Sequence, residues 1–367
     1  MSDENQHATA STKRIGVLQS FPGRGPQTNP YLLQLTDSLG SDVEVMYFSW
    51  RTALLGSYDV LHLHWPERLA RGSSTAKTFV RRLALMALIA RISRRKTPVV
   101  RTMHNLATHE AGDRWERALL RAMDARTTAW IRLNPFTPTP SEVSTVTIRH
   151  GHYRDWYPQP SSSDVIPGRI LFFGLIRPYK GVEDLIGAFA ALDDPSASLR
   201  LAGKPKSAEL AGSIAAASLG DHRVSSVLRH LADDELSQEI GASQLVVLPY
   251  RAVHNSGAAI LALSLGRPVL MPSGETTEWL SEEMGPGWVR TFAGPLTPEI
   301  LREALAAAAE LAGHPDLSRL EWRGIGEAHV RAYRAAIRST HAPRTDHASG
   351  TPVAARTQGV DDVPAGR

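Results

Sequence analysis

Short runs of apolar residues alternate with longer segments of helical periodicity along most of this chain. The runs predict strands at 14–19, 43–48, 60–64, 98–103 and 127–133, and a second series begins at Ile170 and continues at 199–202, 224–228, 245–249 and 268–271. Strands that alternate with helices of about 10–15 residues are typical of a doubly wound parallel sheet. The pattern therefore predicts an α/β protein with two such sheets.

A segment rich in proline and serine separates the two series of strands. The predicted order is a disordered N-terminus at 1–12, an N-terminal Rossmann-like domain at 13–157, a linker at 158–168, a C-terminal Rossmann-like domain at 169–316, a closing helix at 317–340 and a disordered tail at 341–367. A length of 367 residues fits two domains, because single cores rarely grow beyond roughly 250–300 residues. Two facing sheets of this kind enclose a cleft.

The composition narrows the class of protein. Hydrophobic residues make up 42% and charged residues 21%, as in globular proteins with a large core. The absence of cysteine excludes disulfides and thiolate metal sites and favours a reducing cytoplasm. No apolar run is long enough to span a membrane, and the polar first residues do not resemble a signal peptide.

Two cations follow the strand that opens the second series. Arg177 and Lys180 lie in the turn from Gly174 to Gly181, at a strand C-terminus, where open α/β sheets bind ligands. An ammonium beside a guanidinium suits the oxygens of a diphosphate. The alternative is a pair of solvated loop cations.

A second turn of the same sheet offers a helix N-terminus. Asn255 or Ser256 is a good cap, Gly257 allows close approach of a ligand, and the helix dipole favours an anion. The alternative is a plain cap. Because both turns follow strands of one sheet, they predict a shared nucleoside-diphosphate site, with Gly174, Tyr250, Arg251 and His254 nearby.

The N-terminal half supplies candidate acid–base groups at strand ends. His62 and His64 share one face of their strand, Glu67 follows them, and His104 and Glu110 follow the next strand. Each histidine could instead be a hydrogen-bonded core residue. Zinc-type spacings, Asp-x-Asp and GxGxxG are all absent from the sequence, so no metal or dinucleotide cofactor is expected.

No acid occurs between Arg68 and His109, although this stretch holds many cations. Its apolar helical centre is flanked by Arg81, Arg82, Arg91, Arg94 and Arg95, as in helices that lie on anionic membrane surfaces. The alternative is a helix that packs on the sheet and has arginines at its exposed ends. No recognised nucleic-acid-binding motif accompanies the charge.

Several segments together resemble a known family over nearly all of 14–340. The Arg-x-x-Lys-Gly turn and the two-domain plan resemble GT-B glycosyltransferases. The finer resemblance is to the β-1,4-mannosyltransferases of xanthan-type exopolysaccharide assembly, and it is carried by residues 28–32, 58–67, 99–102, 104–106, 150–156, 174–181 and 254–257.

That resemblance implies a donor, GDP-mannose, in the C-terminal domain and an acceptor, a glycan on a polyprenyl diphosphate, in the N-terminal domain at the inner membrane face. It implies inversion, and Val253 to Leu261 indeed lacks the acids of retaining GT-B enzymes. Inversion needs a general base on the acceptor hydroxyl, for which Glu67 is our choice, with His64, His104 and Glu110 as rivals. Arg177, Lys180, Ser256 and Gly257 would stabilise the leaving diphosphate. A nucleotide-sugar epimerase, a retaining transferase with a soluble acceptor and a non-catalytic nucleotide-sugar-binding protein are the alternatives.

Overall fold

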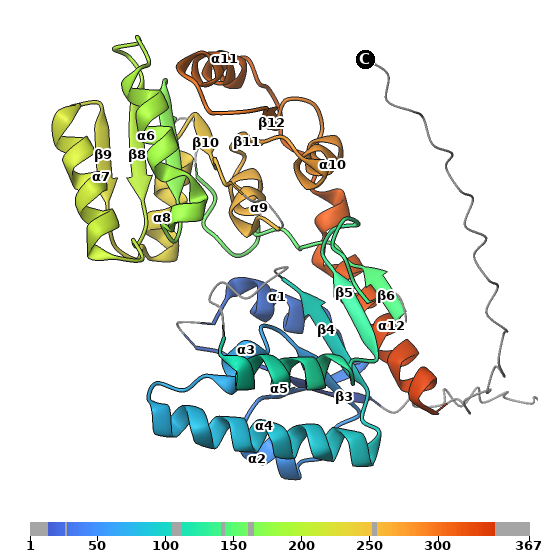
Figure 1. Ribbon diagram of the computed structural model, residues 1–367. Helices are drawn as coiled ribbons and strands as arrows, with labels where there is room; N and C mark the ends of the chain where they lie inside the picture. Colours follow the sequence, from blue (N-terminus) through green and yellow to red (C-terminus); the bar gives the residue numbers. More distant parts are fainter. Residues whose placement is uncertain are drawn as a thin grey trace, which may run out of the picture.

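The computed structural model describes residues 14–25, 28–104, 112–140, 144–160, 165–251 and 255–341. The segments predicted to be disordered at both termini lie almost wholly outside these ranges, as do His109, Glu110 and His254. The described chain forms two α/β units stacked one above the other (Figure 1). Each contains a six-stranded sheet in which every strand pair is parallel.

The first sheet has the strand order β2-β1-β3-β4-β5-β6. Its strands are β1 (Ile15–Gln19), β2 (Val43–Tyr47), β3 (Val60–Leu63), β4 (Val99–Met103), β5 (Ala129–Arg132) and β6 (Ser144–Thr147). Its helices are α1 (Pro30–Ser38), α2 (Trp50–Leu55), α3 (Glu67–Ala70), α4 (Thr75–Arg95) and α5 (Arg114–Asp124). Helix α1 begins at Pro30, because the Asn29 side chain accepts a hydrogen bond from the Tyr31 amide and Pro30 suits the first helical position.

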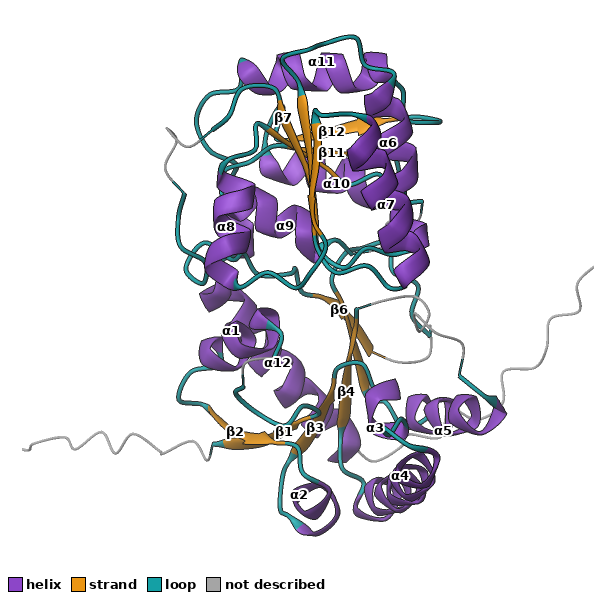
Figure 2. Ribbon diagram, turned by 90° about the vertical axis from the view of Figure 1, so that its left-hand side faces the viewer, coloured by secondary structure: helices purple, strands orange, loops and turns teal. Residues whose placement is uncertain are grey.

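The second sheet has the order β12-β11-β10-β7-β8-β9, with helices on both of its faces (Figure 2). Its strands are β7 (Arg169–Phe173), β8 (Ser198–Ala202), β9 (Val224–Val227), β10 (Leu245–Val247), β11 (Val269–Pro272) and β12 (Val289–Phe292). Its helices are α6 (Val182–Ala190), α7 (Ala208–Gly220), α8 (Asp233–Gly241), α9 (Gly257–Ser264), α10 (Glu275–Met284) and α11 (Pro298–Ala309), with a 3₁₀ turn, η2, at Pro178–Lys180. The predicted α/β class with two parallel sheets is confirmed.

The last helix returns to the first domain. After the 3₁₀ turn η3 (Ser318–Leu320), α12 (Trp322–His341) runs down beside the N-terminal sheet and packs against α1 (Figure 1). Tyr333 on α12 shares a 2.8 Å hydrogen bond with the Nδ1 atom of His62 on β3, and Arg334 pairs with Asp42 at 2.8 Å. The end of the chain therefore completes the core of the domain in which the chain begins.

Candidate active site

The carboxyl ends of β3 and β4 carry a cluster of buried histidines. The rings of His62 and His64 lie 4.1 Å apart between centroids, which confirms that they share one face of their strand. His62 also hydrogen-bonds Thr102 through Nε2 at 2.8 Å, so the hydroxyls of Thr102 and Tyr333 occupy both of its ring nitrogens. His62 is therefore a structural residue of the core.

The hydrogen bonds of His64 indicate its tautomer. Its Nε2 atom lies 3.3 Å from the carbonyl oxygen of the Gln19 side chain, so Nε2 carries the proton and donates it. Its Nδ1 atom therefore accepts, at 2.9 Å, from Nε2–H of His104. Because both ring nitrogens of His64 are engaged, this residue orients His104 and leaves no nitrogen for a substrate, which corrects its candidacy as a base. The Nδ1 atom of His104 keeps its lone pair.

Burial keeps these imidazoles neutral. It lowers the pKa of His64 to about 3 and those of His62 and His104 well below the usual value. The pKa values of the half-buried His150 and the buried His329 are lowered to about 4, also chiefly by desolvation. A neutral imidazole can accept a proton, but a strongly lowered pKa makes it a weak base.

Glu67 opens α3 and lines a cavity of about 510 Å³ together with Arg177 and Lys180. The chain reaches it through Trp65, whose φ of 47° lies in the left-handed region that non-glycine residues rarely adopt. The Trp65 ring stacks on His104 with centroids 4.0 Å apart and planes 20° apart. The carboxylate and the two cations, predicted from separate halves of the sequence, thus meet around one space.

The turn after β7 is held against the turn after β10. Gly181 has a φ of 65°, and a Cβ atom there would lie 2.2 Å from the carbonyl oxygen of Pro249. This close approach requires glycine. The Arg251 amide also donates to the carbonyl of Tyr179 at 2.9 Å. The two turns that the sequence assigns to one ligand are therefore in contact.

Lys180 is a partly buried cation above an aromatic ring. Its Nζ atom lies 4.9 Å from the centre of the Tyr250 ring, and Gly174 leaves the space beside it open. Burial, with a smaller contribution from Arg177, lowers the pKa of Lys180 to about 8. No ion pair joins Arg177 or Lys180 to a carboxylate within the described ranges. Two adjacent cations of this kind form a site for an anion.

The cap of α9 is Ser256, whose hydroxyl accepts from the Ala259 amide at 3.1 Å. The Asn255 side chain instead crosses to the N-terminal domain. Its amide group donates to the carbonyl of His104 at 3.0 Å, and its oxygen accepts from Asn134 at 2.8 Å. A diphosphate role for the Asn255 side chain is therefore corrected to a bridge between the domains.

Asn255 and Ser256 line a separate pocket of about 40 Å³ rather than the 510 Å³ cavity. A Cβ atom on Gly257 would lie 3.6 Å from His150 and from Tyr153. The exposed guanidinium of Arg251 pairs with Asp184 of α6 at 3.1 Å, which accounts for its charge within the C-terminal domain. Because this ion pair is exposed, the expected place of Arg251 near the donor stays a prediction.

The basic helix α4 divides its arginines between two environments. Arg82 is 9% exposed and pairs with Asp113, and Arg91 donates to the Tyr58 hydroxyl at 2.5 Å and stacks on its ring. Both are thus structural, which corrects their assignment to a membrane surface. Arg81, Arg94 and Arg95 are exposed.

Helix α4 also exposes a ridge of apolar side chains. The exposed fractions are 51% for Phe79, 63% for Val80, 45% for Leu83 and 47% for Met86. We call these four residues the α4 ridge. No helix within the described ranges is both long and apolar enough to cross a membrane.

Three further residues of the cavity were not candidate site residues in the sequence analysis: Trp65, Arg68 and Arg71. They adjoin Glu67 in the sequence, and the mixture of tryptophan and arginine around a candidate base was the available signal. In the part of the chain that the structure describes, no group of three or more histidines and acids comes together as a metal site would require.

Comparisons with known proteins show which proteins this chain resembles. Residues 167–311 match the family model described as glycosyl transferases group 1. The chain is 45% identical over 330 residues, 89% of its length and 94% of the relative's, to a GDP-mannose:glycolipid 4-beta-D-mannosyltransferase of Xanthomonas campestris pv. campestris.

Two solved structures share the fold. A sucrose-phosphate synthase of Thermosynechococcus elongatus has a TM-score of 0.60 at 18% identity, covering 89% of this chain and all of that one. Anabaena Alr3699/HepE, in complex with UDP and glucose, has a TM-score of 0.57 at 18% identity, with 88% and 100% covered.

Proposed function

The chain belongs to the GT-B glycosyltransferase family, and from this premise we propose that it transfers mannose from GDP-mannose to a glycolipid. The observation that carries the proposal is the cavity in which Arg177 and Lys180 of the C-terminal domain face Glu67 of the N-terminal domain. The relative's donor and glycolipid acceptor supply the two substrates that such a cavity must bring together.

In this proposal the GDP diphosphate lies on Arg177 and Lys180. Both cations lack a carboxylate partner within the described ranges, so the ligand would supply the missing negative charge. A pKa of about 8 leaves Lys180 mostly protonated at pH 7, so it can stabilise the charge that builds on the leaving diphosphate. The N-terminus of α9, capped by Ser256, would add its dipole if the donor extends to it. Because two side-chain cations carry the charge, transfer is expected to persist in EDTA.

The proposed transfer is a single displacement with inversion. The Glu67 carboxylate takes the proton of the acceptor hydroxyl, and the hydroxyl oxygen forms a bond to the anomeric carbon. The bond from that carbon to the diphosphate oxygen breaks on the opposite face, and its electron pair leaves with GDP. A half-buried carboxylate that faces the two diphosphate cations is suited to this role.

The rival base is His104, whose free Nδ1 lone pair is set by His64. Glu67→Gln is expected to lower kcat by about 10²–10⁴-fold with GDP affinity unchanged. His104→Gln is expected to have a smaller effect on kcat. The reverse order would transfer the role of base to His104.

The proposed acceptor is a glycan on a polyprenyl diphosphate, as in exopolysaccharide assembly, reached at the inner face of the membrane. The α4 ridge, with Arg81 beside it and Arg94 and Arg95 at the end of the helix, is the part of the surface suited to an anionic bilayer. Leu83→Glu with Met86→Glu is expected to reduce binding to phosphatidylglycerol vesicles at least tenfold. Unchanged vesicle binding by this double variant would show that α4 is not the membrane-binding surface.

The test of the whole function is incubation with GDP-mannose and a lipid-linked glycan, followed by NMR of the product. A new mannosyl residue with the β configuration is expected, together with stoichiometric GDP. An α-linked product would refute inversion, and GDP release without transfer would refute the acceptor.

A further inference from the structure

The cavity between the domains carries more positive charge than one diphosphate needs. Its described lining comprises Trp65, Glu67, Arg68, Arg71, Arg81, Leu175, Arg177, Tyr179 and Lys180. One carboxylate thus faces five cations. Two of these cations belong to the C-terminal domain and three, Arg68, Arg71 and Arg81, come from the opposite wall. We call these three residues the arginine wall.

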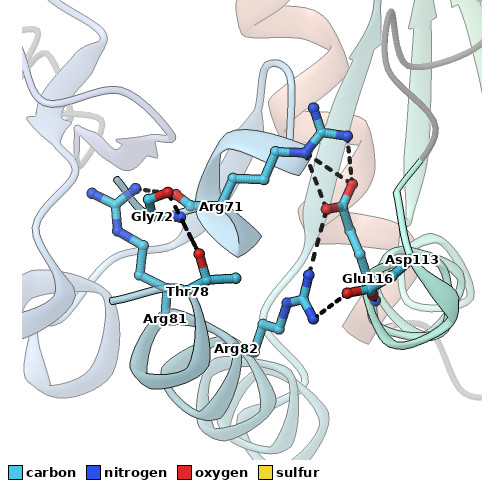
Figure 3. A network of polar contacts seen from close by, with 7 residues as sticks. All are labelled: Arg71, Gly72, Thr78, Arg81, Arg82, Asp113 and Glu116. Carbon is cyan, nitrogen blue, oxygen red and sulfur yellow. Dashed lines mark hydrogen bonds and ion pairs between the residues drawn. The ribbon is translucent and has the colours of Figure 1, made fainter. Parts of the chain in front are cut away.

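Arg71 of the arginine wall is held by the buried carboxylate of Glu116 (Figure 3). The Nη2 atom of Arg71 donates to Glu116 at 2.7 Å, and its Nε atom donates to both oxygens of that carboxylate at 3.0 and 3.1 Å. Glu116 is 3% exposed and also lies 3.8 Å from Arg82, which in turn pairs with Asp113 at 2.7 Å. Arg71 is therefore held in one orientation.

Arg81 is placed by the loop that follows α3. Its guanidinium donates to the backbone carbonyl of Arg71, and the Gly72 amide donates to the Thr78 hydroxyl of α4 at 3.0 Å (Figure 3). Arg68 lies over the Trp65 ring, 5.1 Å from its centre. The wall thus brings guanidinium groups together on a scaffold that is set before any ligand arrives.

Among the described residues, the carboxylates near the arginine wall are too few to pair with all of its arginines. Glu116 already forms ion pairs with both Arg71 and Arg82, and Asp113 forms one with Arg82. Within the described ranges no carboxylate pairs with Arg68 or with Arg81, whose contacts are an aromatic face and backbone carbonyls. Clustered guanidinium groups repel one another, and a phosphate would offer Arg68 and Arg81 an anionic partner that no described carboxylate supplies.

We propose that the arginine wall binds the phosphate or diphosphate of the glycolipid acceptor, as a second anion subsite distinct from that of GDP. The inference rests on the proposed function. Arg81 belongs to the same helix as the α4 ridge and lies between Val80 and Leu83 in the sequence, so a lipid held at the ridge would have its anionic linkage beside the cavity. Glu67 lines the same cavity as both groups of cations, so a sugar attached to that linkage would meet the donor near its carboxylate.

The first experiment needs no turnover. Inorganic pyrophosphate is titrated by calorimetry into full-length protein saturated with GDP, for the wild type and for Arg68→Gln/Arg81→Gln. The wild type is expected to bind pyrophosphate, and the double variant is expected to bind it at least tenfold more weakly with unchanged GDP affinity. Arg331→Gln, an exposed arginine on α12, is the matched control and should behave as the wild type. Absence of pyrophosphate binding to the GDP-saturated wild type would overturn the proposal.

The second experiment identifies the source of the phosphate. Two acceptors carry the same glycan, one on geranyl diphosphate and one on a neutral alkyl chain. The double variant is expected to raise KM at least tenfold for the diphosphate acceptor while KM for the alkyl acceptor and for GDP-mannose stays unchanged. An equal loss with both acceptors would overturn the proposal. Transfer to neither acceptor by the wild type would refute the proposed function, while the calorimetric result would still decide the subsite.

Discussion

Acidification from pH 7 to pH 5 is expected to destabilise this protein strongly, because four buried imidazoles and the half-buried imidazole of His150 remain neutral in the folded state. Burial lowers the pKa of His64 to about 3 and those of His150 and His329 to about 4, and it also lowers those of His62 and His104. In the unfolded chain each histidine titrates near a pKa of about 6.5. Below that pH the unfolded chain binds more protons, so stability falls as the pH falls toward the folded pKa values.

The size of the effect follows from those pKa values. Each of His64, His150 and His329 contributes a loss of about 2 kcal/mol between pH 7 and pH 5, and together they contribute about 6 kcal/mol. His62 and His104 add to this loss. Because the unfolding free energy of a protein is typically about 5–15 kcal/mol, we expect acid unfolding to begin near pH 5.

The assay is urea unfolding followed by tryptophan fluorescence at pH 7, 6 and 5. His329→Leu removes one buried imidazole, whose Nε2 atom has no hydrogen-bond partner among the described residues, and should reduce the loss by about 2 kcal/mol. His222→Gln, at an exposed position, is the control and should leave the loss unchanged. A loss below about 1 kcal/mol in the wild type would refute the reasoning, since one such imidazole alone would exceed it.

The remaining predictions concern charge. The affinity of the wild type for GDP should fall as the pH rises through the Lys180 pKa of about 8. The Lys180→Arg variant should keep its affinity to pH 9.5, because arginine stays protonated. An affinity of the wild type that does not change with pH would show that Lys180 does not contact GDP. Lys180→Met should weaken GDP binding by about 10²-fold in calorimetry, since a charge-assisted contact of about 3 kcal/mol is lost. Glu116→Gln should lower the unfolding free energy by about 3 kcal/mol, because it removes the buried charge that Arg71 contacts at 2.7 Å and Arg82 at 3.8 Å. The exposed Glu303→Gln is its control, and equal urea midpoints for the two variants would contradict that assignment.

The two strands that the sequence analysis missed, β6 and β12, both lie at sheet edges, whereas the other two edge strands, β2 and β9, were predicted. Strand β6 (Ser144–Thr147) has no fully buried residue, and β12 (Val289–Phe292) alternates buried ends with a polar centre. An edge strand has one neighbour and less apolar covering, so its hydrophobic pattern is weak. The central strands, buried on both faces, carry the continuous apolar runs by which the sequence predicts them.

The same distinction holds for the site. The turn that contains Arg177 and Lys180 could be predicted because its signal, a pair of cations directly after an apolar run, lies within a short stretch of sequence. The pairing of Arg71 with Glu116 joins residues 45 positions apart, and that of His62 with Tyr333 joins residues 271 apart. Such contacts depend on how helices and domains pack. A local signal existed for Glu116, which shares a helical face with the buried Leu119 and Met123.

Helix α12 has a consequence for the order in which the protein can fold. Tyr333 and His329 pack beside His62, so the first domain lacks part of its core until the last helix has left the ribosome. The second domain has its own sheet complete well before that point and can form first. The N-terminal domain is therefore translated first but completes its core last. A fragment that ends before Trp322 would lack α12, and its N-terminal domain would have an incomplete core.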